Sequence, residues 1–196
     1  MTKGSDNEFP SVLFGELADT PTTPDAGNWR LFTKADGLYL VDDAGSVTGP
    51  FVASSDGYTE GARVRNDANI AIANGAWTSV TFNTEDFDTD TIHDTGTNPS
   101  RLTCVTAGKY IIVGYLGWGS NTTGLRGVRI LFNNTTVIGG NMDGAPSVGE
   151  SGQNVTAIYA LTAGQYVELQ AYQTITGGGT LEVVQPFIQF AMQRIG

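Results

Sequence analysis

The sequence predicts an all-β protein, built mainly as an antiparallel sandwich or barrel. Of its 196 residues 15% are charged and 40% are hydrophobic, and 26 glycines add to many threonines and asparagines. This composition favours strands and turns over long amphipathic helices. Short apolar runs recur between clusters of Gly, Asn, Asp and Pro, which is the pattern of many short strands.

Residues 1–27 cannot form a core by themselves. They contain three prolines and few apolar side chains, so we expect an extended docking segment that orders on a partner. The predicted docking residues are its clustered apolar side chains, Phe9, Val12, Leu13 and Phe14.

Residues 28–60 are predicted to form a small β-meander that serves as an attachment module. The Asp36-Gly37 pair favours a tight hairpin turn, and Gly49-Pro50 is expected to end the third strand. Three short strands bury little surface, so the module needs a neighbouring domain or further copies of itself. The expected strands are 29–33, 38–41 and 46–48.

Residues 61–196 are predicted to form the head, a single antiparallel sandwich. Turn signals separate its strand-like runs at short intervals. The expected strands are 62–65, 77–82, 101–105, 110–118, 125–132, 155–161, 165–172 and 183–192.

The last two runs alternate between apolar and mixed positions, which defines the two faces of each strand. Successive side chains of a strand point to opposite faces of the sheet, so the apolar set belongs in the core. The opposite faces combine aromatic rings with polar groups, as protein interfaces do. The predicted core set is Val167, Leu169, Ala171, Ile188, Phe190 and Met192.

Two blocks of the head resemble the complement C1q-type globular domain, which shares the TNF-like jelly roll. The run 101–110 resembles its aromatic-Thr-Cys-x-x-x-Gly-x-Tyr signature, with Thr103, Cys104, Gly108 and Tyr110 in place. The run 161–172 is similar to its Leu-x-x-Gly-x-x-Val-x-Leu-Gln strand pair. The resemblance covers roughly residues 61–196 and implies that the sandwich is a jelly roll.

The flanking module resembles a small domain that precedes receptor-binding or fibre domains in tailed-bacteriophage proteins. The matching residues are Asn28 to Leu31, Asp36 to Tyr39, Val41 to Gly45 and Gly49 to Phe51. The collagen-like Gly-x-y stalk of animal complement proteins is not found ahead of the head. The resemblance therefore implies a virion protein, made in the host cytoplasm, in which residues 1–60 replace the stalk.

We predict a homotrimer in which the mixed faces of the last two strands form one shared surface. The jelly-roll resemblance implies that these strands are neighbours, so three subunits could share the surface about an axis. The alternative is ordinary surface with scattered aromatic rings. The predicted interface residues are Tyr166, Glu168, Gln170, Tyr172, Phe187 and Gln189.

No catalytic site is predicted. Catalysis requires ionisable groups that converge with suitable pKa values. His93 is the only histidine and lies in a polar stretch, where we expect a surface loop residue. Cys104 is the only cysteine and is expected to be a buried structural thiol.

No cofactor or metal is predicted either. The acidic run at 85–90 is expected to be a solvated loop, because it lacks the spacing of an EF-hand. Calcium binding near Asp86, Asp88 and Asp90 remains an alternative.

Glycine- and threonine-rich stretches at 119–124, 145–152 and 175–179 are predicted to be loops at the ends of the sandwich. Trp118, Asn121 and Tyr58 are the candidates for stacking on, or hydrogen bonding to, a sugar. A host-surface glycan is therefore an alternative partner.

Charge and hydropathy argue against two classes of partner. The net charge of −10 repels a nucleic-acid backbone, and the longest apolar stretches are far shorter than the roughly 18 residues of a membrane span. A lone cysteine is consistent with a reducing cytoplasm.

We therefore expect a non-enzymatic bacteriophage virion protein. Its expected role is that of a capsid decoration protein, head fibre or spike that binds a capsid or tail protein. A tail-fibre or receptor-binding adhesin module is the alternative.

Overall fold

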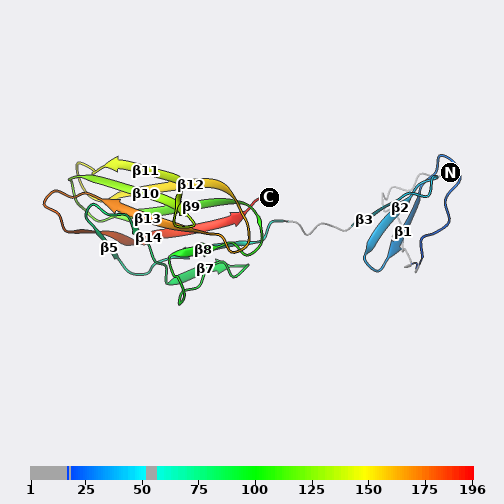
Figure 1. Ribbon diagram of the computed structural model, residues 1–196, viewed down its shortest axis with the longest axis horizontal. Coiled ribbons are helices and arrows are strands. Elements are labelled where there is room, and N and C mark those ends of the chain that lie inside the picture. The colour runs from blue at the N-terminus through cyan, green and yellow to red at the C-terminus, as the bar shows by residue number, and fades with distance from the viewer. Residues whose placement is uncertain (1–16, 18, 52–56) are drawn as a thin grey trace, which may run out of the picture. The chain divides into compact units, whose positions relative to one another are not determined.

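The computed structural model describes residues 17, 19–51 and 57–196, and the regular structure in these ranges is entirely β-strand. The chain divides into two compact units, Met1–Gly57 and Tyr58–Gly196 (Figure 1). Among the described residues, no helix is long and apolar enough to cross a membrane. The predicted docking residues Phe9, Val12, Leu13 and Phe14 lie outside the described residues.

The smaller unit is the predicted antiparallel meander. Its strands β1 (Arg30–Lys34), β2 (Gly37–Val41) and β3 (Val47–Phe51) pair in chain order. The third strand continues through Gly49 and Pro50, which the sequence analysis placed at its end. An edge strand tolerates proline because one side of its hydrogen-bond ladder has no partner.

One face of the meander buries a small core. The Phe32 and Tyr39 rings stack with 5.4 Å between their centroids, and Val41 is buried beside them. On the same face Arg30 donates hydrogen bonds to Thr22, which ties the preceding chain to the sheet.

The larger unit is a sandwich of two antiparallel sheets. The six-stranded sheet has the order β12-β9-β14-β4-β7, with β5 also paired to β14; the five-stranded sheet has the order β11-β10-β13-β6, with β8 also paired to β13. The six-stranded sheet contains β4 (Gly61–Arg65), β5 (Ile70–Ala73), β7 (Thr84–Asp88), β9 (Gly108–Trp118), β12 (Ser151–Leu161) and β14 (Thr180–Arg194). The five-stranded sheet contains β6 (Thr78–Ser79), β8 (Arg101–Thr103), β10 (Leu125–Phe132), β11 (Thr136–Gly144) and β13 (Tyr166–Gln173).

The core lies between the two sheets and confirms the predicted core set. Each of its six side chains is at most 1% exposed, because period-two alternation directs every second residue of β13 and β14 inward. Tyr110, Trp118 and Phe82 are the largest aromatic side chains that join them in the same cluster.

Three strands of the sandwich are missing from the predicted set, namely β5, β7 and β11. Strands β7 and β11 lie at the ends of their sheets, where a strand pairs on one side only and charged or small residues are common. The acidic run at 85–90 was expected to be a loop, yet its first part forms β7. Apolar alternation is too weak in β7 and β11 to indicate them, whereas β5 is an apolar run of only four residues.

Candidate functional site

The outer face of the six-stranded sheet carries adjacent apolar side chains from three strands. By register Val113 on β9 lies between Thr156 on β12 and Ala191 on β14, and Ile111 lies opposite Ile158. Residues directly opposite each other in an antiparallel pair share a face. Ile158 is 66% exposed and Val113 is 38% exposed, so this apolar area is open to solvent in the isolated protomer.

Two aromatic rings extend this surface. Tyr115 and Phe187 meet edge to face, with 6.1 Å between their ring centroids. Glycines make the room: a Cβ at Gly117 would lie 2.6 Å from the Cβ of Phe187, and one at Gly152 would overlap the Tyr115 hydroxyl. We call the surface formed by Ile111, Val113, Tyr115, Ile158 and Phe187 the apolar face.

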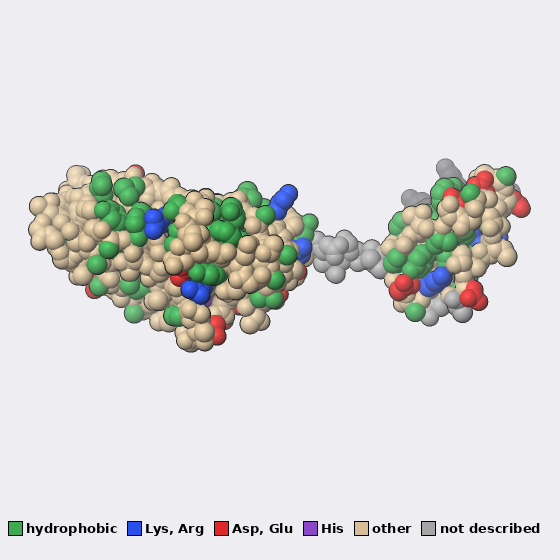
Figure 2. Space-filling model, in the orientation of Figure 1, with side chains coloured by type: hydrophobic (Ala, Val, Ile, Leu, Met, Phe, Trp, Pro, Cys, Tyr) green, Lys and Arg blue, Asp and Glu red, His purple; other side chains and the backbone are tan. Residues whose placement is uncertain are grey.

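Charged groups lie at the border of the apolar face. Arg63 and Arg65 on β4 approach the Asp86 carboxylate to 3.2 and 2.9 Å. These side chains are partly exposed, so the pairs contribute little stability. On the side of the larger unit drawn in Figure 2, the Lys and Arg side chains are scattered over a mostly uncharged surface.

The six predicted interface residues do not form one surface. Strand β13 belongs to the five-stranded sheet and β14 to the six-stranded sheet, so the expectation that they are neighbours is wrong. Phe187 and Gln189 lie on the outer side of β14, whereas Tyr166, Glu168, Gln170 and Tyr172 lie on the outer side of β13. The alternation of each strand was correct, but it carries no information on which strands pair.

The two polar residues of this β13 group are already satisfied within the protomer. Glu168 accepts a hydrogen bond of 2.6 Å from Ser100 and lies 3.8 Å from Arg101. Gln170 accepts one of 2.8 Å from Arg129 and donates one of 3.0 Å to Ser79. Both are less than 10% exposed, because short strands and loops cover this part of the sheet.

The two tyrosines of the group are stacked on other side chains. The Arg101 guanidinium lies 3.9 Å from the centroid of the Tyr166 ring, and the rings of Trp77 and Tyr172 lie 5.1 Å apart. The aromatic surface of β13 is therefore largely covered by intramolecular contacts.

Most of the apolar face was not predicted from the sequence. The alternation within 110–118 was a usable signal, since Ile112 and Leu116 face the core and Val113 and Tyr115 must then face outward. Ile158 could be found in the same way from the alternation within 155–161. What the sequence lacks is the pairing of β12, β9 and β14 that brings these residues together.

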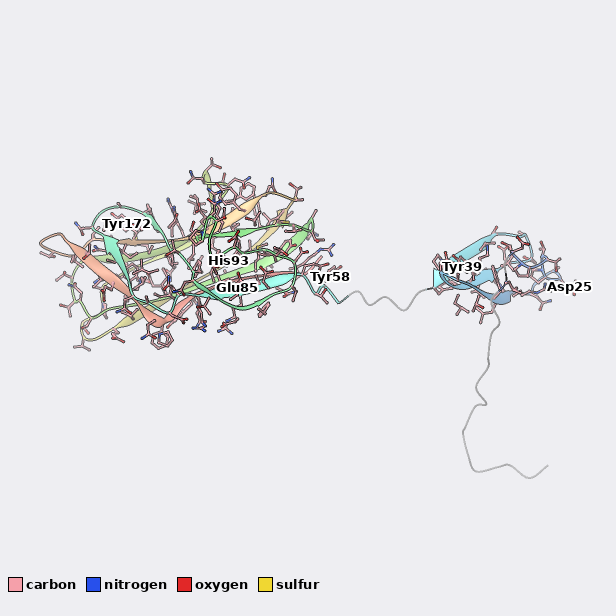
Figure 3. All side chains as sticks on the ribbon, turned by 90° about the horizontal axis from the view of Figure 1, so that it is seen from below. Asp25, Tyr39, Tyr58, Glu85, His93 and Tyr172 are labelled. Carbon is pink, nitrogen blue, oxygen red and sulfur yellow. The ribbon has the colours of Figure 1, made fainter. Side chains whose placement is uncertain are left out.

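His93 is buried, which corrects the prediction of a surface loop residue. Its Nδ1 lies 2.9 Å from Glu85 Oε1 and its Nε2 lies 3.2 Å from the Pro99 carbonyl oxygen. Figure 3 shows His93 and Glu85 side by side, away from Tyr172. Both ring nitrogens are engaged, so the imidazole has a structural role at the edge of the sandwich.

The three aspartates considered for calcium have separate partners. Asp88 accepts hydrogen bonds from three backbone N–H groups of the turn that follows β7, and Asp90 accepts bonds from Thr106. Asp86 pairs with the arginines at the border of the apolar face. No group of three or more metal-ligating side chains gathers within the described residues.

Cys104 is a buried thiol, as predicted. It is 1% exposed, and its Sγ and the Tyr110 hydroxyl both donate to the Thr106 carbonyl oxygen, at 3.2 and 2.6 Å. Burial raises the pKa of Cys104, and burial together with the nearby Cys104 raises the pKa of Tyr110. Both groups therefore stay protonated near neutral pH, and the thiol is not activated as a nucleophile.

The three residues considered for sugar contacts do not form a site. Trp118 is fully buried and donates to Gln153 Oε1 at 3.1 Å, so its ring cannot stack on a ligand. Trp118 pairs with Val183 near the start of β14, whereas the Tyr58 carbonyl accepts a bond from Gln193 near its end. These two rings therefore lie at opposite ends of the sandwich.

The smaller unit has an apolar second face. By register Leu31 lies opposite Leu40, and Leu38 lies opposite Phe51. Leu31 is 39% exposed and Phe51 is 46% exposed. Strand β2 is apolar at four successive positions, which is typical of a strand that is buried on both faces.

No protein-family model matches the chain, and no curated protein sequence matches it. Solved structures do resemble it: murine APRIL at pH 5.0, the Eiger TNF of S. frugiperda, and the globular domain of zebrafish complement 1qA. Sequence identities are 8%, 12% and 14%, and TM-scores are 0.54, 0.54 and 0.53. The matches cover 69%, 70% and 70% of this chain and 98%, 92% and 97% of the respective solved chains. The head therefore has the TNF/C1q-type jelly-roll fold, which confirms the predicted fold class.

Proposed function

We propose that the protein is a homotrimeric structural component of a tailed-bacteriophage virion. In this proposal residues 1–60 bind a capsid or tail protein, and the jelly-roll head is displayed as a decoration protein, head fibre or spike. The protein acts by assembly and binding, and it is made in the host cytoplasm before it joins the particle.

The apolar face is the observation that supports the proposed trimer. Exposed apolar patches on a folded domain often mark an interaction site, and burial contributes about 25 cal/mol per Å² of apolar area. On this face the uncharged polar residues Asn154, Gln189 and Gln193 lie among the apolar side chains. Ile158 and Phe187 are exposed by 66% and 43%, and the centre of the face is uncharged. Of the predicted interface residues, Phe187 and Gln189 belong to this revised interface, while the four on β13 do not.

The apolar second face of the meander supports an attachment role for the smaller unit. Its leucines and Phe51 are suited to packing against an apolar groove on a virion partner. The resemblance of 28–51 to a bacteriophage module favours the same role. The docking role of Phe9, Val12, Leu13 and Phe14 stays a prediction.

The absence of catalysis is supported by the state of the two residues with most potential for it. The His93 ring is held between Glu85 and Pro99, and Cys104 is buried with a raised pKa. His93 lines a cavity of about 400 Å³, but both of its ring nitrogens are already engaged, and the Cys104 thiol is buried.

The trimer is tested by the solution mass of the full chain from multi-angle light scattering. A mass of three protomers is expected at micromolar concentration, and a monomer across that range would refute the trimer. The virion role is tested separately by mass spectrometry of density-purified particles of the phage that encodes the chain. Stoichiometric recovery with the capsid is expected, whereas its absence from the particles would refute the role.

A further inference from the structure

A groove of about 270 Å³ crosses the outer face of the five-stranded sheet. It lies over strands β10 and β11 and is open to solvent along its length. Its walls are mainly apolar, and the polar side chain that faces it is the Arg129 guanidinium. The residues that shape it are Trp77, Arg129, Val137, Asn141 and Met142.

Glycines at two positions leave room for this groove. A Cβ at Gly127 would lie 3.0 Å from the Trp77 ring and 3.3 Å from Met142 Cε, so a larger residue would displace the ring from the sheet. Gly140 lies directly opposite Arg129 in the ladder, and its missing side chain leaves the guanidinium uncovered on that side.

The Arg129 side chain is held in place by two neighbours, each of which is supported by a further residue. Its guanidinium lies 4.2 Å from the centroid of the Trp77 ring, and Trp77 packs in turn on Tyr172. Nε donates a bond of 2.8 Å to Gln170, which Ser79 orients from the next strand. Such a fixed guanidinium loses little conformational entropy when it binds a ligand.

The rest of the guanidinium is available. Within the described residues, neither terminal nitrogen of Arg129 makes a hydrogen bond or an ion pair, and no carboxylate lines the groove. Burial lowers the pKa of Arg129, in keeping with a cation that is partly desolvated and lacks a counter-ion. Two parallel N–H groups of a guanidinium match the two oxygens of a carboxylate.

We propose that this groove binds an acidic sugar unit of a surface polysaccharide, with the sugar carboxylate on Arg129. One side of the sugar ring would contact Val137 and Met142. The volume is below the roughly 300–1,000 Å³ of pockets for drug-sized ligands, so it suits one ring. Because the groove is open to solvent, neighbouring sugar units can continue across the surface.

This inference rests on the proposed role in display and names a receptor chemistry for it. The groove is on the sheet opposite the apolar face, so trimer formation would leave three grooves open. Three weak sites on one particle component would bind a repetitive polymer with high avidity.

The test measures binding of short glucuronic acid oligosaccharides to the full chain by isothermal calorimetry. A neutral glucose oligosaccharide of equal length and a glutamate peptide are the comparison ligands. We expect the acidic sugar to bind and the Arg129→Gln variant to weaken it by at least about tenfold, as for a lost charge-assisted pair. Arg101→Gln is the matched control, since it removes another ring-stacked arginine from the same sheet, and it should change the Kd less than twofold.

A second variant guards against misfolding of the first. Val137 is 50% exposed on β11, so Val137→Asp should fold and should repel the acidic ligand as strongly. Equal binding of neutral and acidic sugars, no binding of either, or an unchanged Kd in both variants would overturn the proposal. Equal or tighter binding of the glutamate peptide would replace the sugar by an acidic peptide.

A short oligosaccharide reports on one groove, so its Kd does not depend on trimer formation. Sugar binding to the groove can therefore be absent while light scattering still finds a trimer. It can also bind the acidic sugar in a protein that proves to be monomeric.

Discussion

The two outer faces of the jelly roll carry similar residue types, but these side chains are covered on one face and exposed on the other. On the five-stranded sheet, Tyr166 and Tyr172 are stacked on Arg101 and Trp77, and the polar residues between them have partners within the protomer. On the six-stranded sheet, Ile158 and Phe187 project into solvent. An aromatic residue on an outward strand face is thus a poor guide to an interface unless the cover from other segments is known.

The largest effect is expected when charge is placed on the apolar face. Ile158→Asp would put three carboxylates into the proposed trimer interface and cost about 3–5 kcal/mol, because a buried unpaired charge is poorly compensated. We expect monomers in light scattering and an unchanged circular dichroism spectrum. Tyr172→Asp is the matched control on the opposite sheet and should remain trimeric; dissociation by that variant alone would return the interface to β13.

A pair of aromatic truncations sharpens the same contrast. Trp77→Ala should lower the free energy of unfolding by about 2 kcal/mol, since Tyr172 and Arg129 lose their packing partner, and should leave the trimer intact. Phe187→Ala should weaken association with a smaller effect on unfolding of the protomer. Urea denaturation and mass measurements on both variants check this, and equal behaviour of the two would argue against a difference between the faces.

The core beneath both faces should lose stability in alkali. Burial raises the pKa values of Cys104 and Tyr110 above their ordinary values of 9.0 and 10.0, so the folded state retains protons that the unfolded state releases. Stability is fully present below pH 9 and falls above it, by up to about 1.4 kcal/mol per pH unit for each group. Urea midpoints from pH 7 to 11 measure the fall, which Tyr110→Phe and Cys104→Ala should reduce.

The smallest effect is expected at the charged border of the apolar face. Asp86→Asn should change the free energy of unfolding by about 0.5 kcal/mol, because its arginine partners are partly exposed to solvent. Asp88→Asn, two residues along the same strand, keeps one acceptor oxygen but replaces the other with an amide group that cannot accept a backbone N–H, and it removes the charge that strengthens these bonds. It should therefore cost more than Asp86→Asn. Thermal unfolding of the two variants compares them directly, and equal losses would mean that the acidic run acts as one unit.

The sequence by itself determined the all-β class, the meander and the inward faces of the strands. These features are local. Val167, Leu169 and Ala171 occupy alternate positions of one strand, so their side chains point to the same face and are buried between the sheets. The resemblance at 101–110 and 161–172 pointed to the jelly roll, and Cys104 was correctly expected to be buried.

Only the tertiary structure decided which surfaces are exposed. Sequence alternation cannot distinguish the cover that Trp77 provides for Tyr172 from the open position of Phe187, because that cover comes from residues far away along the chain. His93 was assigned to the surface because its neighbours are polar, yet Glu85 and Pro99 enclose it. The pairing of strands depends on contacts between residues far apart along the chain. It places β13 and β14 in different sheets, and it brings together the residues of the apolar face and of the Arg129 groove.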